Sequence, residues 1–406
     1  MSIASDPEFR SFRISMLIND TRYRSMTFQV IAFIVLMLAF AYLGSNLAKN
    51  LAAAGLNISF DFLSSTSGYD INQRLIEYDS QSSNYRAAIV GILNTLLVAF
   101  LACITATVFG VAAGVLRLSK NWLVKTIMAV YVEIFRNIPV LIWIIIIFTI
   151  MTAVMPGARA YLGEDPQKDL ALGMFAFTNR GVYAPAPIWG PGSGIVVAVF
   201  IASVIGIFAF RRYARKLLYD TGRLLPTGWP SLALLIVPSV LAFFVMGQPI
   251  GLDYPDPLAN RFNLQGGIQI GAPLIALWFA LSIYTGAFIA ENVRAGIQAV
   301  SNGQTEAASA LGLRPGRVMN LVVLPQALRV IIPPLISQYL NITKNSSLAI
   351  AVGYADITAT LGGITLNQTG RAIECVVLLM LFYLTVSLLI SFVMNIYNSS
   401  MKLKER

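Results

Sequence analysis

The stretch AAIVGILNTLLVAFLACITATVFGVAAGVL (87–116) is 30 residues long and contains no Asp, Glu, Lys or Arg. A bilayer core of about 30 Å is crossed by about 20 helical residues, because each residue adds about 1.5 Å. The stretch therefore predicts a membrane-spanning helix, and it sets the fold class for the rest of the chain.

Seven further segments meet or approach the same criterion on either side of this stretch. The first of them is followed by LAAAG (51–55), which resembles a signal-peptidase site. The apolar run before this site is longer than that of a signal peptide, so we expect an uncleaved span. The sequence predicts an all-α membrane protein with about eight transmembrane helices. The other seven spans are expected at 28–47, 122–155, 195–210, 231–247, 268–290, 328–350 and 372–397.

The composition agrees with a polytopic membrane protein. Of 406 residues, 57% are hydrophobic and 12% are charged, whereas a soluble domain has about 25% charged residues. The chain has no histidine, and its two cysteines, Cys103 and Cys375, lie inside apolar runs, so we expect no metal site and no catalytic residue. It contains no G-x-x-x-x-G-K-[S/T] stretch either, so any nucleotide energy must come from another subunit.

The basic residues predict the orientation. With the N-terminus inside, 19 of the 29 Lys and Arg residues fall in cytoplasmic segments and 8 on the opposite side, which places both termini in the cytoplasm. The net charge of +10, including the run RRYARK (211–216), indicates contact with anionic lipid and not with nucleic acid.

The loop between the sixth and seventh spans contains GQTEAASALGLRPGRVMNLVVLP (303–325). Its first part predicts a short helix with Thr305 available as a cap and small alanines on one side. Gly312 and the following Arg-Pro-Gly end that helix, and a second one is expected over 317–324, stopping at Pro325. Two short helices at an angle, with basic residues at the corner, would fit a groove in a soluble partner.

The spacing in this loop resembles the EAA loop, E-A-A-x3-G-x9-I-x-L-P, which marks the membrane subunits of ABC importers. Val322 replaces the isoleucine of that pattern. The resemblance implies that the loop couples the membrane subunit to its ATPase. The residues implied in this coupling are Glu306, Ala307, Ala308, Gly312, Arg314, Val322, Leu324 and Pro325.

Three flanking segments are similar to the polar amino acid permeases of the histidine-permease-like branch: GILNTLLVAF (91–100), YVEIFRNIPVLIWI (131–144) and AFIAENVRAGIQAVSNGQTEAA (287–308). Asn137, Ile138 and Ala295 are mild departures from the branch's motifs. The resemblance covers roughly 87–150 and 268–397, and it implies the transmembrane fold of type I ABC importers (MetI-like).

The expected domain layout follows from the extent of this resemblance. Residues 1–86 would form a cytoplasmic N-terminus, an extra first helix and a periplasmic loop. Residues 87–397 would form the ABC type-1 transmembrane domain, with an inserted segment at about 151–267 that holds two extra helices and periplasmic loops. Residues 398–406 would be a cytoplasmic tail. This longer layout looks most like the large permease subunits of general L-amino acid importers.

The resemblance also implies a function and a set of partners. The chain would form half of the translocation pathway of an ATP-driven amino acid importer in a bacterial inner membrane. Its partners would be an ABC ATPase dimer that binds ATP and Mg, a second permease subunit that is a related but different chain, and a periplasmic amino-acid-binding protein. The substrates would be polar or general L-amino acids, with acidic and amide amino acids among them.

Two other classes of function compete with this one. An ion-gradient-driven secondary transporter would predict inverted repeats with broken helices and buried acidic groups, whereas Glu133 is the only carboxylate well inside a predicted span. An intramembrane enzyme would need a nucleophile–base pair, and none is evident in the sequence.

Two sets of polar residues fall within the predicted spans, where ionisable groups are costly. Glu133 and Arg136, at i and i+3, predict a structural ion pair, with a gate or substrate role as the alternative. The helix is expected to bend near Asn137 and Pro139, so that 122–136 lies along the inner interface. The second set forms a polar belt in the seventh span: Asn341, Thr343, Lys344, Asn345, Ser346 and Ser347. This belt either lines a substrate pathway or makes hydrogen bonds between helices, and Asn94 and Thr95 could join either arrangement.

Overall fold

The computed structural model describes residues 18, 20–53, 55, 57–163, 167–223, 225–257 and 263–401. Most of the polar N-terminal segment and the end of the predicted cytoplasmic tail, residues 402–406, lie outside the described residues. The chain divides into two compact units, Met1–Asp61 and the chain from Phe62 onward. In the first unit, α2 (Thr21–Ala53) contains the predicted span 28–47, and its side chains are exposed along almost its whole length.

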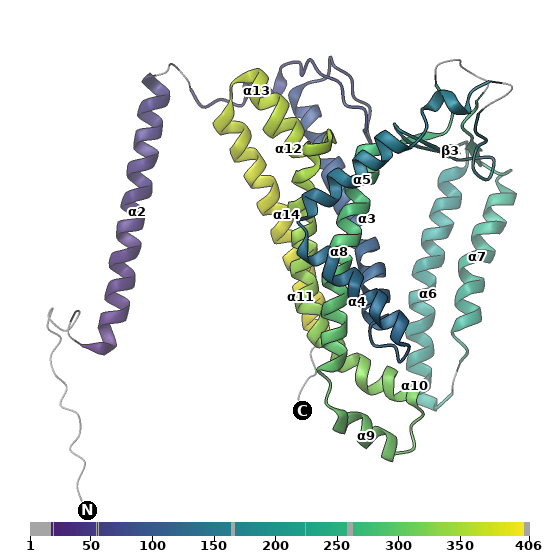
Figure 1. Cartoon of the computed structure of the whole chain (residues 1–406). Helices are drawn as coiled ribbons and strands as arrows, with labels where there is room; N and C mark the ends of the chain where they lie inside the picture. Colours follow the sequence, from purple (N-terminus) through teal and green to yellow (C-terminus); the bar gives the residue numbers. More distant parts are fainter. Residues whose placement is uncertain are drawn as a thin grey trace, which may run out of the picture. The chain divides into compact units, whose positions relative to one another are not determined.

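The second unit contains the other long helices, labelled in Figure 1. They are α3 (Asn84–Leu116), α4 (Trp122–Asn137), α5 (Val140–Val154), α6 (Ser193–Thr221), α7 (Gly228–Val245), α8 (Ala272–Gln298), α11 (Leu324–Asn345) and α14 (Ala372–Met401). In the described part of the chain, seven helices are long and apolar enough to cross a membrane, or eight when the bent pair α4–α5 counts as one span. The prediction of an all-α membrane protein with about eight spans is therefore confirmed.

The bend between α4 and α5 is 105°, at the position that the sequence predicts. Ile138 is extended, with φ −105° and ψ 131°, because a residue before proline is disfavoured in the helical region. Pro139 then stands as the N-cap of α5, where its missing N–H is not needed. The bend therefore follows directly from the Ile-Pro step.

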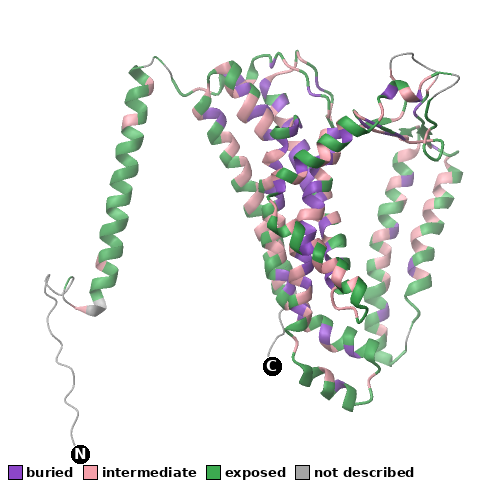
Figure 2. Ribbon diagram, in the orientation of Figure 1, coloured by how far each residue is buried: buried purple, intermediate pink, exposed green. Residues whose placement is uncertain are grey.

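The core of the second unit is built around α3 and α8, where purple buried residues concentrate in Figure 2. Glycines allow the two backbones to approach closely. A Cβ on Gly110 would lie 2.5 Å from Cβ of Ile289, and a Cβ on Gly114 would lie 2.6 Å from the carbonyl oxygen of Ala290. Small residues at a helix contact are typical of packing inside membranes, where dispersion contacts drive association.

The predicted insertion contains α6 and α7, which pack mainly on each other. Before and after them lie short strands that the sequence analysis does not predict. β1 (Ala176–Thr178), β2 (Gly181–Ala184) and β5 (Ile268–Gly271) form one antiparallel sheet, and β3 (Ala186–Trp189) pairs with β4 (Ile250–Asp253). Because β5 leads straight into α8, the first sheet attaches the insertion to the core.

Residues 62–83 also belong to the core unit, although the sequence analysis groups them with the N-terminal segment. The short helix η1 (Asp61–Ser64) leads into this loop, and Phe62 packs against Ile357 and Leu361. Further along the loop, Ile71 and Tyr78 pack on α3. This loop therefore covers one end of α3.

Short helices complete the chain on both sides of α11. α9 (Asn302–Ala310), α10 (Pro315–Val318) and the π-helical turn η3 (Met319–Val323) precede it. The 3₁₀ helix η4 (Ser346–Val352), α12 (Ile357–Ala359), the π-helical η5 (Thr360–Thr365) and α13 (Leu366–Thr369) follow it, and η2 (Ala158–Tyr161) lies after α5. In Figure 1, α9 and α10 lie at one end of the second unit, and α12 and α13 lie at the other.

Candidate functional site

The predicted coupling loop is a short helix held by a defined C-terminal motif. α9 ends at Ala310, and Gly312 follows in the left-handed region at φ +76°. The N–H of Gly312 donates to the carbonyl of Ser309 (2.9 Å), and the N–H of Leu313 donates to the carbonyl of Ala308 (3.3 Å). These two bonds make a Schellman motif, which needs a residue that tolerates positive φ. The predicted end of the helix at Gly312 is therefore confirmed.

Two details of the predicted loop are wrong. Thr305 is not the cap, because α9 already starts after Ser301, and the Thr305 hydroxyl donates to the carbonyl of Asn302 (2.7 Å). The second helix does not stop at Pro325 either. The chain runs from α10 through η3 into α11, and Pro325 lies in the first turn of α11. The π-helical turn just before Pro325 changes the hydrogen-bond spacing, so the helix accommodates the proline there.

The eight residues implied in coupling divide into two that are buried or half-buried and six that are exposed. Ala308 is buried and Val322 is half-buried, and both belong to a small apolar cluster with Val318 and Val323 that holds the loop together. The six exposed residues are Glu306, Ala307, Gly312, Arg314, Leu324 and Pro325. In Figure 2 this end of the second unit is mostly green.

Two exposed leucines in the same loop were not singled out from the sequence. Leu311 is 82% exposed and Leu321 is 65% exposed. Leu311 directly follows the alanine-rich run that ends at Ala310, and Leu321 directly precedes Val322. The loop therefore presents apolar, acidic and basic groups together.

The helix ends next to this loop are joined by charged side chains. Glu291 on α8 forms ion pairs with Arg294 one turn later and with Arg117, which caps α3. Arg117 and Arg294 are both counted among the cytoplasmic basic residues in the predicted orientation. The pairs fix the end of α3 against α8 close to where the coupling loop begins.

Asn94 and Thr95 are fully buried, and they make hydrogen bonds within the chain. The amide of Asn94 donates to the carbonyls of Gln73 (2.7 Å) and Ala355 (2.9 Å). The hydroxyl of Thr95 donates to the carbonyl of Gly91 (2.8 Å) and accepts the N–H of Ile357 (3.1 Å). The two residues join α3 to the 62–83 loop and to the segment after η4.

Tyr354 and Asp356 complete this arrangement, and the sequence analysis missed them. The hydroxyl of Tyr354 donates to the carbonyl of Asn94 (3.1 Å). Asp356 is buried, and its Oδ1 accepts the N–H of Ala359 (2.8 Å) as the N-cap of α12. An aspartate directly before Ile-Thr-Ala is an N-cap pattern, so the helix start could have been predicted. Together with Asn94 and Thr95, these residues form what we call the outer polar cluster.

The hydroxyls of the belt on α11 and η4 bond to carbonyls of α11. Thr343 and Ser346 are buried and donate to the carbonyls of Tyr339 (3.0 Å) and Thr343 (2.7 Å), and Ser347 donates to the carbonyl of Lys344 (2.8 Å). Asn341 and Lys344 are exposed, and Asn345 is half-buried. Among the hydrogen bonds described for residues 341–347, none reaches Asn94 or Thr95. No direct hydrogen bond therefore joins the two predicted sets among the described residues, and whether they act together stays a prediction.

The predicted ion pair between Glu133 and Arg136 is wrong. Among the ion pairs of the described residues, these two do not occur together. The Arg136 guanidinium lies over the ring of Phe288 on α8, 5.3 Å from its centroid, and Asn137 donates to Oε2 of Glu133 at 3.4 Å. Spacing of i and i+3 brings two side chains near each other, but here an aromatic face and an amide are better placed partners.

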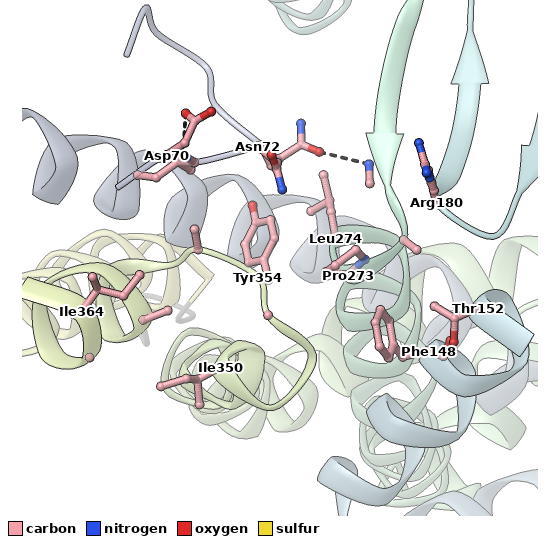
Figure 3. A pocket seen from close by; sticks show the side chains of 18 of the residues that line it. Asp70, Asn72, Phe148, Thr152, Arg180, Pro273, Leu274, Ile350, Tyr354 and Ile364 are labelled. Atoms are coloured by element: carbon pink, nitrogen blue, oxygen red, sulfur yellow. Dashed lines mark hydrogen bonds between the residues drawn. The ribbon is translucent and has the colours of Figure 1, made fainter. Parts of the chain in front are cut away.

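A cavity of about 1050 Å³ opens at the end of the unit that carries α12 and α13. Its walls come from the 62–83 loop, the end of α5, the β1–β2 turn, the start of α8 and the segment after η4. Figure 3 shows Asp70 and Arg180 on opposite sides, with Tyr354, Pro273 and Leu274 between them. Charged and amide side chains on an apolar base are typical of a site for a small polar molecule.

Comparison with known proteins defines the class. Residues 194–403 match the family described as binding-protein-dependent transport system inner membrane component, and the chain belongs to this family. The match begins inside the predicted insertion. The expected class, a multi-pass permease subunit of an ABC transport system, is thereby confirmed.

Individual relatives extend the similarity over the whole chain. The chain is 50% identical over 430 aligned positions to the glutamate/glutamine/aspartate/asparagine transport system permease protein BztB of Rhodobacter capsulatus, with 100% of both chains covered. It is 45% identical over 399 positions to the general L-amino acid transport system permease protein AapQ of Rhizobium johnstonii, covering 98% of this chain and 96% of the relative. A crystal structure of an amino acid ABC transporter with histidines aligns with a TM-score of 0.44 at 19% identity, over 78% of this chain and 94% of that one.

Proposed function

We propose that this chain is the larger of two different permease subunits in an ATP-driven amino acid importer of a bacterial inner membrane. The observation that carries the proposal is the exposed loop of α9 and α10 on a membrane protein whose full-length relatives are named as amino acid permeases. The relatives' names support L-amino acids as substrates, with glutamate, glutamine, aspartate and asparagine among them.

The coupling loop is the contact with a separate ATPase dimer, which binds ATP and Mg. Glu306, Arg314 and the exposed Leu311 enter a groove on that subunit, while Ala308 and Val322 keep the two short helices in position. When ATP closes the dimer, the loop moves with it and shifts the pathway between its inward-open and outward-open forms. ATP drives this change because it binds one form of the complex more tightly than the other.

The orientation of the chain in the membrane follows from the assignment of the coupling loop as the contact with the ATPase. The coupling loop faces the cytoplasm, as do both termini, in agreement with the distribution of Lys and Arg. The end with the cavity then faces the periplasm, where a binding protein delivers the amino acid. Basic residues at the inner end of α6, in the run 211–216, contact anionic lipid headgroups.

The exposed residues of the belt, Asn341 and Lys344, line the pathway between the two permease subunits. Asn94 and Thr95, in contrast, are fully buried and hold the subunit together. Replacing Lys344 by methionine is expected to weaken uptake while the complex still assembles. The control is Ser346→Ala, at a buried position of the belt whose hydroxyl donates to the carbonyl of Thr343 (2.7 Å), and it should leave uptake unchanged. If Lys344→Met prevents assembly of the two permease subunits, the belt is an interface and the pathway assignment is incorrect.

The direct test is purification of the chain, through a tag, together with its co-expressed partner subunits. We expect an eluate that hydrolyses ATP, at a rate that rises when an amino-acid-loaded binding protein is added. Uptake of each amino acid into proteoliposomes then defines the substrates. A folded chain that copurifies with no ATPase and still moves amino acids along an ion gradient would instead establish a secondary transporter.

A further inference from the structure

We propose that the β1–β2 turn of the insertion supplies a carboxylate-binding residue, Arg180, to the mouth of the translocation pathway. This rests on the proposed function, because the ligand is the transported amino acid on its way in. The ligand chemistry is a carboxylate, which an amino acid carries on its α-carbon and, for aspartate and glutamate, on its side chain as well.

The backbone at Arg180 is firmly held. Its N–H donates to Oγ1 of Thr178 (3.2 Å), and its carbonyl accepts the N–H of Ala272 at the start of α8 (3.1 Å). The next residue, Gly181, has φ +131°, and a Cβ there would collide with the carbonyl of Ile270. The turn can therefore be built only with glycine at this position, and it places Arg180 at a fixed point on the cavity wall.

The guanidinium itself has no described partner. The Arg180 side chain is exposed and lines the cavity, and no hydrogen bond or ion pair of its guanidinium occurs among the residues that the structure describes. Arginine offers five donors in a planar fork that matches a carboxylate. An unpaired fork at the edge of this cavity is therefore well placed to bind an anion.

The only acidic residue on the cavity wall, within the described parts of the chain, is Asp70, and it already has partners. Its Oδ1 accepts the N–H of Ile71 (2.8 Å) and lies 3.6 Å from the guanidinium of Arg74. The charge left unbalanced in the cavity is thus positive, which favours a carboxylate. Asp70 stands opposite Arg180 in Figure 3, so its carboxylate does not neutralise the guanidinium.

Amide side chains supply further hydrogen bonds. Asn72, Asn179 and Gln368 line the cavity, and no side-chain hydrogen bond is described for them. Gln73, in contrast, is engaged, because its Oε1 accepts the N–H of Gly271 (3.1 Å). The free amides can donate to carboxylate oxygens or accept from an ammonium group.

The test measures uptake by proteoliposomes that hold the complete complex, at saturating binding protein, with glutamate and glutamine compared. Arg180→Gln is expected to lower glutamate uptake about tenfold, as loss of one charge-assisted contact does. An equal loss for glutamine identifies the α-carboxylate as the ligand, and a loss confined to glutamate identifies the side-chain carboxylate. Arg180→Lys should retain part of the activity, because it keeps the charge but loses the planar fork.

Two controls establish whether the loss of uptake arises at the cavity. Lys168→Gln removes an exposed positive charge from the same insertion away from the cavity, and it should leave uptake unchanged. The concentration of loaded binding protein that half-saturates ATPase stimulation should also be unchanged in Arg180→Gln. A higher concentration would make Arg180 a docking residue for the binding protein and overturn the proposal, as would unchanged uptake of both amino acids. Failure of the wild-type complex to transport any amino acid would instead refute the proposed function.

Discussion

The coupling loop and the outer polar cluster lie at opposite ends of the same unit, and they use polar residues in opposite ways. In the coupling loop, Glu306 and Arg314 are exposed, and the loop is held by a Schellman motif and a small apolar cluster. In the outer polar cluster, Asn94, Thr95 and Tyr354 are buried and bonded to backbone groups of distant segments. The first region leaves its polar groups exposed, whereas the second uses them to hold the fold.

This difference indicates how each region should respond to substitution. A change in the outer polar cluster should reduce the stability of the subunit, because buried polar groups and close backbone contacts are lost together. A change in the exposed part of the coupling loop should reduce transport with little effect on stability. Single substitutions in each region test this contrast.

The largest effect is expected for Gly91→Ala, next to the outer polar cluster, where the Gly91 carbonyl accepts from Thr95. The added Cβ would collide with Oγ1 of Thr360 and lie 2.9 Å from Cα of Ile357, so α3 must move away from η5. Overpacking of this kind destabilises by about 3 kcal/mol. Thermal unfolding of the purified complex can be measured as the loss of detergent-soluble protein on heating. The midpoint temperature of the variant should be clearly lower than that of the wild type.

Gly363→Ala is the matched control for that prediction, because its added Cβ would lie 3.5 Å from the carbonyl of Thr358, which is ordinary contact. Its midpoint should stay close to that of the wild type. Equal shifts for the two variants would mean that the close approach at Gly91 does not matter.

A smaller effect is expected for Gly312→Ala in the coupling loop. Alanine at φ +76° costs about 1 kcal/mol, and the surrounding space is open, so the strain distorts only the end of α9. We expect faster protease cleavage within 302–325 and reduced ATP-dependent uptake, with an almost unchanged unfolding midpoint. Gly316→Ala, also in open space but without a positive φ, should behave as the wild type. Normal uptake with intact protection from protease would contradict the role given to the Schellman motif.

The smallest effect is expected for Glu133→Gln. Because Glu133 is exposed and not paired with Arg136, removal of its charge should change stability by less than about 0.5 kcal/mol. Arg136→Gln, which loses the contact with Phe288, should have the larger effect of the two. A large loss with Glu133→Gln would show that a charged partner exists in the assembled complex.

Much of the fold is predictable from local sequence. The spans follow from long runs without charge, the bend before Pro139 follows from proline sterics, and the end of α9 follows from Gly312. The partners of Asn94 and Arg136 are not predictable in this way. The carbonyls of Gln73 and Ala355 and the ring of Phe288 come from segments far away in the sequence, so only the folded chain brings them together. The strands of the insertion were missed because they are only three or four residues long.

The candidate site was predictable to a similar extent. The spacing in the coupling loop predicts which residues take part in coupling, and that stays a prediction. It does not distinguish the buried Ala308 from the exposed Ala307. Arg180 could not have been found from the sequence, because its role depends on a sheet that joins residues 181–184 to residues 268–271.

The most direct test of the coupling role is the Glu306→Lys substitution in the complete complex. Glu306 is exposed and outside the apolar cluster of the loop, so the subunit should insert and unfold as the wild type does. ATP hydrolysis and amino acid uptake are measured on the same proteoliposomes, with Gly316→Ala as the control. We predict that uptake falls to background and that hydrolysis no longer rises with loaded binding protein. Wild-type uptake with normal stimulation would contradict the assignment of this loop as the contact with the ATPase.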